Sequence, residues 1–439
     1  MSPNTSTPES WDPLVQGKDE PELLVAAQKR EIANILRSYT GYNDLFSELL
    51  QNSLDAIERR MEEEGEGFTG QLWITLNLDD SSISLTDNGI GMTLSQFKQF
   101  LKPNFSFKEG ASTRGSKGVG ATYLGYGFNY LEVATKRNGT VNSAVLSNGR
   151  DWVDDTTGTI SRPMMVYAPP SHAAFGGLDR GTSTVLRLIG KNIRPKNLSY
   201  YNATTADQWM AILRAFTPVG GVYLCGESAP KIKISLEVLA NGIVSSASLD
   251  QPNYLWPHEV LGKTADLREF LADQQSRAKK QQDISKIPPR FTNLNGYWGV
   301  WLGTEILEGE SIVSPRLTQH ERELLQQLNV KLYCFMGFST ELWDQYNDEK
   351  LKLRMGFRIL RGGLQQATKH MPQGAPITIP LTQNIGYQNI THVVVHFDNA
   401  EPDLGRKGFQ PENTKLAERL AQSSVTPDLC TAFEALKRC

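Results

Sequence analysis

The sequence predicts an α+β protein with two successive domains. Segments with helical apolar spacing come first, strand-like runs then cluster between helices, and a new series of elements follows the polar, proline-containing segment 191–199. The 439 residues also exceed the usual size of one domain. We therefore expect an N-terminal arm and helix over 1–34, an α/β sandwich over 35–195 with its helices on one face, and an α/β domain over 196–439.

The composition is that of a globular protein. Apolar residues make up 39%, charged residues 21% and the net charge is −3, which argues against disordered, collagenous and membrane classes and gives no general sign of nucleic-acid binding. The four cysteines are too far apart for a zinc knuckle or a disulfide framework. Because the N-terminus lacks a leader pattern and no stretch is long and apolar enough to span a bilayer, we expect a cytoplasmic protein without a membrane partner.

The elements of the first part follow from their periodicity. Apolar residues at steps of three and four predict a helix from Pro21 and another over about 42–63. Alternating residues predict an antiparallel hairpin of strands 72–78 and 82–86. Further strands are expected at 130–135, 141–146, 164–167 and 182–189.

The second part shows a comparable succession. We expect helices at 206–216, 265–282, 413–421 and 427–438, and strands at 231–239, 296–302, 330–336, 356–360 and 392–397. The basic residues of helix 265–282 indicate a solvated face rather than a nucleic-acid surface. His392 and His396 share one face of a strand, but no third ligand accompanies them, so we expect packing or solvent contact rather than metal binding.

A polar stripe marks the second helix. Glu48, Asn52 and Asp55 stand at positions i, i+4 and i+7, so their side chains project from one face while leucines pack the other. Taken alone, this pattern is more typical of a solvated helix than of a binding site.

The segment Asp87-Asn88-Gly89-Ile90-Gly91-Met92 follows the second strand of the hairpin. Asp-Asn-Gly is typical of a tight turn in which the glycine takes a positive φ. The second glycine allows close approach of a ligand, and the apolar residues beside it suit a purine pocket. A carboxylate at this position can accept a hydrogen bond from the adenine amino group.

A glycine-rich segment, Gly115-Ser116-Lys117-Gly118-Val119-Gly120, precedes a helix that we expect to begin near Val119. Backbone amides at such a helix start can cradle phosphates. A P-loop would need lysine directly after its second glycine and a preceding strand, and the dinucleotide fingerprint is also absent.

In this order the three segments resemble the N, G1 and G2 boxes of the GHKL ATPases, which include DNA gyrase, the ninety-kilodalton heat-shock chaperone, histidine kinases, MutL and the MORC proteins. MORC-like ATPases are the most similar branch. The resemblance implies a Bergerat-type ATP-binding sandwich over residues 35–195, with a lid over 95–117. It also implies a second, transducer-like domain over 196–439.

The resemblance assigns roles to individual residues. Glu48 would be the general base that activates water, Asn52 would ligate Mg²⁺, and Asp87 would select adenine, with Asp55 supporting the pocket. The remaining residues expected to contact ATP are Gly89, Gly91, Met92, Gly115, Ser116, Lys117, Gly118, Val119, Gly120 and Thr182, the last in a Gly-Thr pair beside the adenine-binding aspartate. An ordinary strand start is the alternative interpretation of that pair.

The transducer would supply a cation to the γ-phosphate. The loop after strand 392–397 resembles the place where MORC-like proteins carry their lysine, which makes Lys407 the first candidate and Arg406 the second. A solvated basic turn is the alternative interpretation of this loop.

The resemblance implies Mg²⁺-dependent ATP hydrolysis that drives a homodimeric clamp. Glu48 and the absence of a preceding phospho-acceptor helix argue against a histidine kinase. Our first hypothesis is a MORC-like or MutL-like role on DNA in genome defence, including antiviral defence, or in repair, with any cutting activity in a separate effector protein. Two alternatives remain open, namely chaperone-like remodelling of a protein client and a nucleotide-gated module that hydrolyses ATP negligibly.

Overall fold

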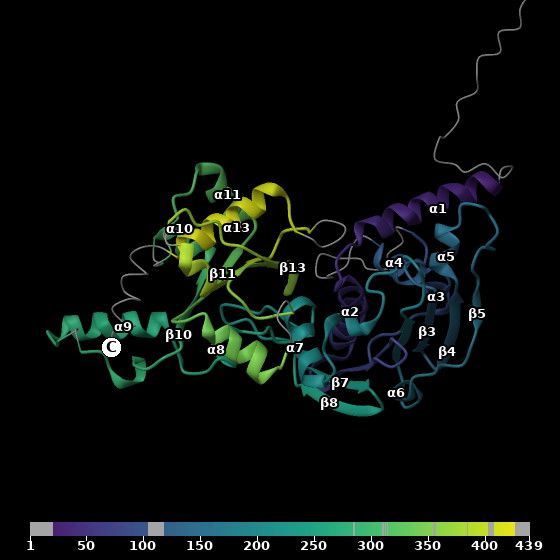
Figure 1. Ribbon diagram of the computed structural model, residues 1–439, viewed down its shortest axis with the longest axis horizontal. Coiled ribbons are helices and arrows are strands. Elements are labelled where there is room, and N and C mark those ends of the chain that lie inside the picture. Colours follow the sequence, from purple (N-terminus) through teal and green to yellow (C-terminus); the bar gives the residue numbers. More distant parts are fainter. Residues whose placement is uncertain are drawn as a thin grey trace, which may run out of the picture.

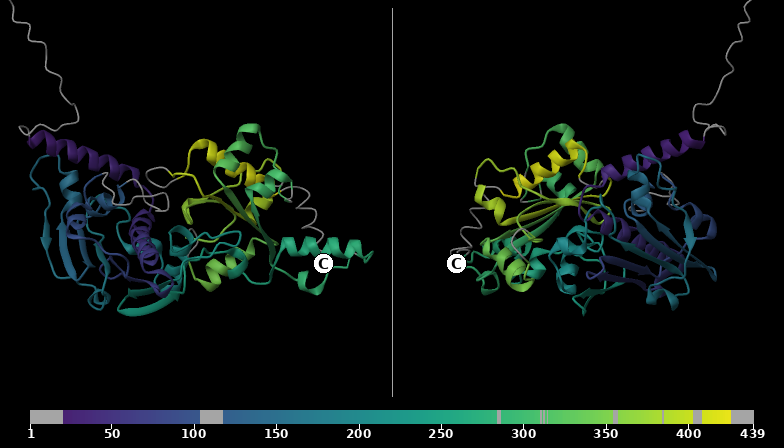
Figure 2. Two further views of the ribbon diagram at one scale, coloured as in Figure 1. Left: turned by 180° about the vertical axis from the view of Figure 1, so that it is seen from behind. Right: turned by 45° about the vertical axis from the view of Figure 1, so that its right-hand side comes forward.

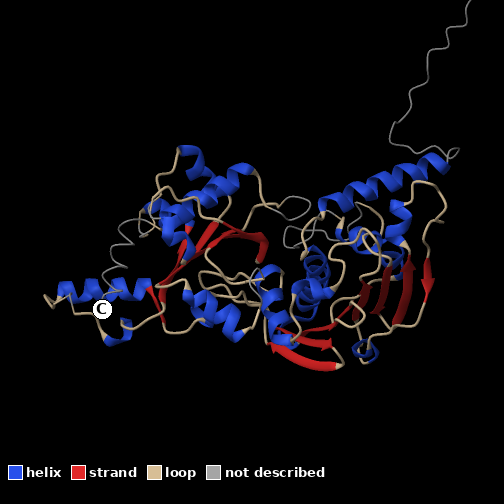
Figure 3. Cartoon of the chain, in the orientation of Figure 1, coloured by secondary structure: helices blue, strands red, loops and turns tan. Residues whose placement is uncertain are grey.

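The computed structural model describes residues 21–103, 118–283, 286–309, 311, 313, 315–353, 357–383, 385–402 and 408–425. These residues form a mixed α/β structure with two mixed β-sheets, as the sequence predicts at this coarse level (Figure 1). Figure 3 shows the strands of both sheets in red, and the colours of Figure 1 place most of the larger sheet in the N-terminal half of the chain and the smaller sheet in the C-terminal half.

The larger sheet has eight strands in the order β5-β4-β3-β6-β2-β1-β7-β8. Neighbouring strands are antiparallel except that β1 and β7 are parallel. The strands are β1 (Gly70–Asn77), β2 (Ser82–Asp87), β3 (Tyr130–Arg137), β4 (Thr140–Ser147), β5 (Met165–Tyr167), β6 (Gly181–Arg187), β7 (Ile232–Ala240) and β8 (Ile243–Leu249).

Helices cover one face of this sheet (Figure 2). The helix α2 (Asp44–Glu64) packs on β1 and β2, α4 (Gly120–Tyr126) on β3, and α7 (Ala206–Phe216) on β7 and β8. The long N-terminal helix α1 (Pro21–Ser38) lies over α4 and α5 (Gly149–Asp154). Alternation along β1 explains this arrangement, because Leu72, Ile74 and Leu76 are buried under the helices while the residues between them face the other side.

The opposite face carries one short helix, α6 (Ala173–Gly176), which contacts β2 and β6. His172 fixes this segment, since its imidazole lies 3.2 Å from the Thr75 hydroxyl and 2.6 Å from the Thr86 hydroxyl. The expectation of helices on one face therefore holds for the larger helices of the described part.

The smaller sheet has six strands in the order β13-β12-β14-β11-β10-β9. They are β9 (Thr264–Asp266), β10 (Gly296–Leu302), β11 (Val330–Gly337), β12 (Gly363–Thr368), β13 (Met371–Ile377) and β14 (Thr391–Phe397). The helices beside it are α8 (Pro257–Val260), α9 (Leu267–Lys279), α10 (Gly303–Glu308), α11 (Gln319–Gln327), α12 (Glu341–Asp344) and α13 (Pro411–Ser423).

Every residue of β11 is buried, so both faces of this strand are covered. Tyr333 and Phe335 belong to the core that continues into the larger sheet, whereas Leu332 and Cys334 belong to a second core under α11 and α13. One face of the smaller sheet thus shares a core with the larger sheet, whereas its other face packs in a separate core.

Two expectations about the second part differ from the structure. The division between the sheets does not lie at residue 195, because β7 pairs with β1 along its length and takes β8 into the larger sheet. The expected strand 356–360 is also absent from the described residues 357–360. There the amides of Ile359 and Leu360 donate to the Asn347 side chain instead of a neighbouring strand.

Most other elements lie within a few residues of their expected bounds. The basic helix is shorter than expected, because Asp266 caps it and β9 precedes it. The expected helix 427–438 lies outside the described residues. Within the described part of the chain, no helix is long and apolar enough to cross a membrane.

Candidate functional site

The polar stripe of α2 faces inward. Glu48 and Asp55 are buried, with exposed fractions of 4% and 3%, and Asn52 between them is half-buried. Leu50 and Leu54 on the other side of the helix lie in the core. Two acidic groups at such low exposure exclude the solvated-face interpretation of this helix.

Glu48, in the polar stripe of α2, contacts the end of the glycine-rich segment 115–120. The Tyr39 hydroxyl donates a hydrogen bond to Glu48 Oε1 at 3.1 Å, and the ring of Tyr39 stacks on Tyr123 of α4 with centroids 4.0 Å apart. The second carboxylate oxygen lies against the first residue of α4, since a Cβ atom at Gly120 would be 1.9 Å from Glu48 Oε2. A side chain at position 120 would therefore displace the carboxylate.

Asp87, the first residue of the segment 87–92, is hydrogen-bonded to residues of α2 and β6. Its carboxylate is 2% exposed and accepts a hydrogen bond from the Gly89 amide at 2.9 Å. The Ser53 side chain and the Thr182 amide are also hydrogen-bonded to it. Burial outweighs these donors and raises the pKa of Asp87 to about 7.

The glycines of the second segment allow close backbone contacts. A Cβ at Gly89 would be 2.6 Å from the carbonyl carbon of Ala56 on α2. Gly91 has a φ of +68°, and a Cβ there would be 2.3 Å from the Lys136 carbonyl oxygen. The sequence predicts a positive φ at Gly89, but the structure has it at Gly91. Gly89 instead allows close contact with the backbone of α2.

The Gly-Thr pair on β6 lies beside Asp87, as expected. Thr182 is opposite Asp87 on β2 and opposite Thr135 on β3. Met92, which follows Gly91, donates its amide to Thr135 Oγ1 at 2.8 Å, and the same hydroxyl lies 3.3 Å from that of Thr182. These threonines connect the second segment to the middle of the sheet.

The described part of the third segment leads into α4. Gly118 has a φ of +63°, Val119 is buried in the core with 6% exposure, and Gly120 begins the helix. The predicted ATP contacts Gly115, Ser116 and Lys117 lie outside the described residues, as do Arg406 and Lys407. Of the expected lid over 95–117, residues 95–103 are described and include most of α3 (Leu94–Gln99).

Sequence reasoning missed three side chains that hold this site. Tyr39 precedes α2, Ser53 follows Asn52, and Thr135 is near the end of β3. The position of Ser53 one residue after Asn52 on the helix was the only available signal for it. Tyr39 and Thr135 reach the site through tertiary packing, which no local pattern reveals.

Metal ligands are sparse in the described part of the chain, where no group of three or more His, Cys, Asp and Glu side chains could hold a metal ion. His392 is instead hydrogen-bonded to the Tyr254 hydroxyl and the Arg361 carbonyl, and burial lowers its pKa to about 4. His396 lies 2.9 Å from Asp398. Both side chains are 1% exposed, so of the two expected alternatives, packing and solvent contact, the structure shows packing.

The site therefore presents two buried carboxylates in different surroundings. Asp87 accepts hydrogen bonds from two backbone amides and a hydroxyl, while Glu48 lies between the Tyr39 hydroxyl and the first residue of α4. The first arrangement suits recognition of a hydrogen-bond donor, and the second suits a base that acts on a nearby proton. Neither family models nor curated proteins give a match to this chain.

Proposed function

We propose that the chain is an Mg²⁺-dependent ATPase of the GHKL type, with a Bergerat-type domain built on the larger sheet. The observation that carries the proposal is that the second and third sequence segments both contact α2, the helix that contains the first segment. Glu48 lies against Gly120, and Asp87 lies against Ser53 with Gly89 packed on Ala56. Segments separated by up to 72 positions in sequence, as Glu48 and Gly120 are, thus form one site.

Asp87 would accept a hydrogen bond from the adenine amino group. The donors already bonded to Asp87 hold its carboxylate in place, so little ordering would be needed when the base binds. In this proposal Thr182, which is opposite Asp87, would form a polar contact with the base, and Met92 would form an apolar one. The ionised form of Asp87 is the stronger acceptor for the adenine amino hydrogen.

Glu48 would act as general base toward the attacking water. A hydrogen bond from Tyr39 and contact with Gly120 hold the carboxylate at the start of α4. Positioned carboxylates of this kind contribute about 10² to 10⁴ in rate. These contacts support the proposal of Glu48 as an oriented base.

Asn52 is a fitting ligand for Mg²⁺. It lies half-buried between two acidic positions on α2 and offers an amide oxygen, the type of ligand that Mg²⁺ prefers. Mg²⁺ commonly keeps several waters and is bound through one or two protein ligands and substrate phosphates, which fits a single amide ligand. Bound there, Mg²⁺ would offset phosphate charge.

In this proposal the smaller sheet and its helices form the transducer, and Lys407, or Arg406 in its place, would contact the γ-phosphate. ATP would close a homodimer, and hydrolysis would reopen it. DNA is the proposed target, in defence or repair in the cytoplasm, with a separate effector protein for any cutting. The continuous core between the two sheets supports a mechanical link between site and transducer.

Steady-state phosphate release with and without DNA tests this function. Stimulation of turnover by duplex DNA would support the clamp on DNA, and stimulation by an unfolded protein alone would favour chaperone-like remodelling. Tight ATP binding without turnover would favour a nucleotide-gated module. Absence of saturable ATP binding would overturn the proposal.

A further inference from the structure

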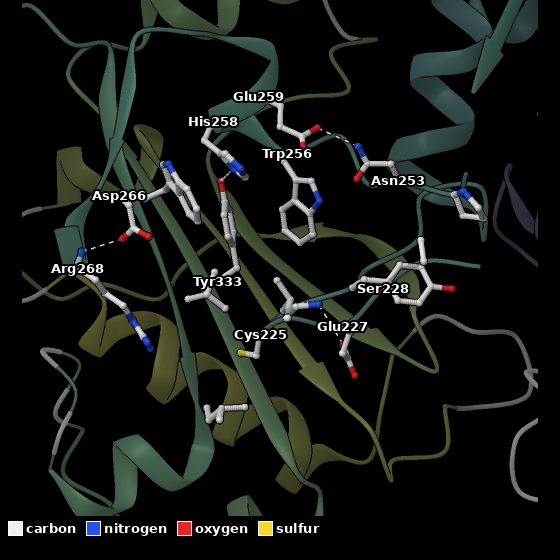
Figure 4. A pocket seen from close by; sticks show the side chains of 18 of the residues that line it. Cys225, Glu227, Ser228, Asn253, Trp256, His258, Glu259, Asp266, Arg268 and Tyr333 are labelled. Carbon is white, nitrogen blue, oxygen red and sulfur yellow. Dashed lines mark hydrogen bonds between the residues drawn. The ribbon is translucent and has the colours of Figure 1, made fainter. Parts of the chain in front are cut away.

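A hollow of about 720 Å³ lies beside the smaller sheet, away from the site on α2 (Figure 4). The loop 223–229, the segment 251–259 and strands β9 and β10 form its walls. Its volume is in the range of small-molecule sites. None of the predicted ATP-site residues lines it.

Aromatic rings form one wall. Trp256 lies 4.6 Å from Tyr333, and His258 stacks on Trp298 with centroids 4.1 Å apart. The His258 Nδ1 atom is 2.9 Å from the Tyr333 hydroxyl, and burial lowers the pKa of His258 to about 4. The imidazole is therefore neutral at pH 7 and adds no positive charge to this wall. Trp256 and Tyr333 are buried, so Trp298 is the ring of the three that is partly exposed.

Carboxylates predominate among the charged groups of the hollow. Glu227, Glu259, Asp266 and Glu305 line it, against one guanidinium, that of Arg268. Arg268 is paired with Glu305 at 2.7 Å. Carboxylates thus outnumber cationic groups among the lining residues.

Three of these carboxylates already have a cationic partner. Glu227 pairs with Lys331, and Glu259 lies 3.7 Å from Arg214, while Glu305 has Arg268. No described basic side chain forms an ion pair with Asp266, although it is half-buried. Its ordinary structural role is to cap α9, for which one oxygen accepts the Arg268 amide at 2.8 Å.

We propose that this hollow binds an organic ammonium ion, with Asp266 as the counter-charge and the half-buried ring of Trp298, its partner on the neighbouring strand, in contact with the alkyl groups. Aromatic faces attract ammonium ions through the ring quadrupole, and a carboxylate beside them adds charge complementarity. Figure 4 shows the rings of Trp256 and Tyr333 between Asp266 and Glu227. A free polyamine and the lysine side chain of a protein share this chemistry.

Calorimetric titration of the full chain with three butyl compounds tests the site. Butyltrimethylammonium and butylammonium are expected to bind with a Kd of about 0.1–1 mM, whereas butanol, which has the same chain without charge, is not. Spermidine and an acetylated peptide with one lysine then distinguish the free and the protein-borne source by competition. Absence of saturable binding by both ammonium compounds, or equal binding of butanol, would overturn the proposal.

Matched variants locate the binding. Asp266→Asn keeps a good helix cap and removes the charge, so affinity should fall about tenfold without loss of folding. Glu269→Gln on the same helix removes an exposed charge outside the hollow and should change affinity less than about twofold. Trp298→Leu should also weaken binding, with the thermal midpoint as a check on folding. Unchanged affinity in Asp266→Asn would contradict the assignment.

Discussion

Glu48 Oε2 occupies the space that a side chain at Gly120 would need, with only 1.9 Å between that oxygen and the position of a Cβ atom. Gly120 has no positive φ, so the helix itself would accept alanine. The contact is with the flexible end of a glutamate. The Glu48 carboxylate can therefore keep its position only if residue 120 has no side chain.

Gly120→Ala should preserve the fold and impair catalysis. The added methyl group displaces the Glu48 carboxylate, so we expect kcat for ATP hydrolysis to fall about tenfold or more, with the thermal midpoint nearly unchanged. Gly67→Ala is the matched control, because a Cβ there meets nothing within 4 Å. Unchanged turnover in Gly120→Ala would show that Glu48 does not need its present position.

Tyr39→Phe removes the hydroxyl that donates to Glu48 and keeps the ring that stacks on Tyr123. Loss of one such hydrogen bond should lower kcat about three- to tenfold, with little change in the KM for ATP. Tyr130→Phe removes a hydroxyl that donates to Glu132 at 3.3 Å, outside the proposed site, and should leave kcat unaltered. A change confined to KM would argue against a role for Tyr39 in positioning the base.

ATP affinity should depend on pH through Asp87. Its pKa is about 7 in the folded chain, and the ionised form is the stronger acceptor for the adenine amino hydrogen, so affinity should fall as pH decreases from 8 to 6. Equilibrium titration of ATP over this range measures the effect. Affinity that is constant between pH 8 and pH 6 would contradict the role of Asp87.

The same shift affects stability with a defined sign. Because folding raises the pKa of Asp87 from 3.8 to about 7, the folded state holds the proton more tightly, and this contribution to stability is lost as pH rises through about 7. Asp87→Asn should therefore have a higher thermal midpoint than the original chain at pH 8, and the difference should shrink at pH 5. Asp250→Asn, which makes the same substitution at an exposed position, is the matched control.

Gly181→Ala should destabilise the larger sheet. Gly181 has a φ of +145°, and a Cβ there would be 2.0 Å from the Asp87 carbonyl oxygen on the neighbouring strand. Neither backbone can yield without breaking the β2–β6 pairing, so the free energy of unfolding should fall by about 3 kcal/mol. Urea unfolding measures this, and a loss below about 1 kcal/mol would show that the strands adjust.

The sequence predicts the local elements of the first sheet well, because each has its own periodicity and turn. The pairing of β7 with β1 was not predictable in this way, since Lys231 to Leu239 shows the same alternation whichever sheet it joins. The irregular stretch at 357–360 depends on Asn347, ten or more positions earlier, which no local pattern indicates. Long-range contacts decided both cases.

The site likewise has features that the local sequence predicts and features that depend on tertiary packing. The spacing of Glu48, Asn52 and Asp55 predicts a shared helix face, and the structure places two of the three in buried positions. Burial itself was not predictable, nor was the proximity of Gly120 to Glu48, because both arise from the packing of α4 against α2. The hollow beside β10 had no motif, since its aromatic and acidic residues come from separate stretches of sequence between Tyr223 and Tyr333.

The most direct test of the account measures ATP binding and phosphate release on the same preparations of the original chain, Glu48→Ala and Asp87→Asn, with Mg²⁺ present. We predict that Glu48→Ala binds ATP with nearly unchanged affinity, remains a dimer with ATP, and releases phosphate at least about 100-fold more slowly. Asp87→Asn should not bind ATP. Normal phosphate release by Glu48→Ala would contradict the account.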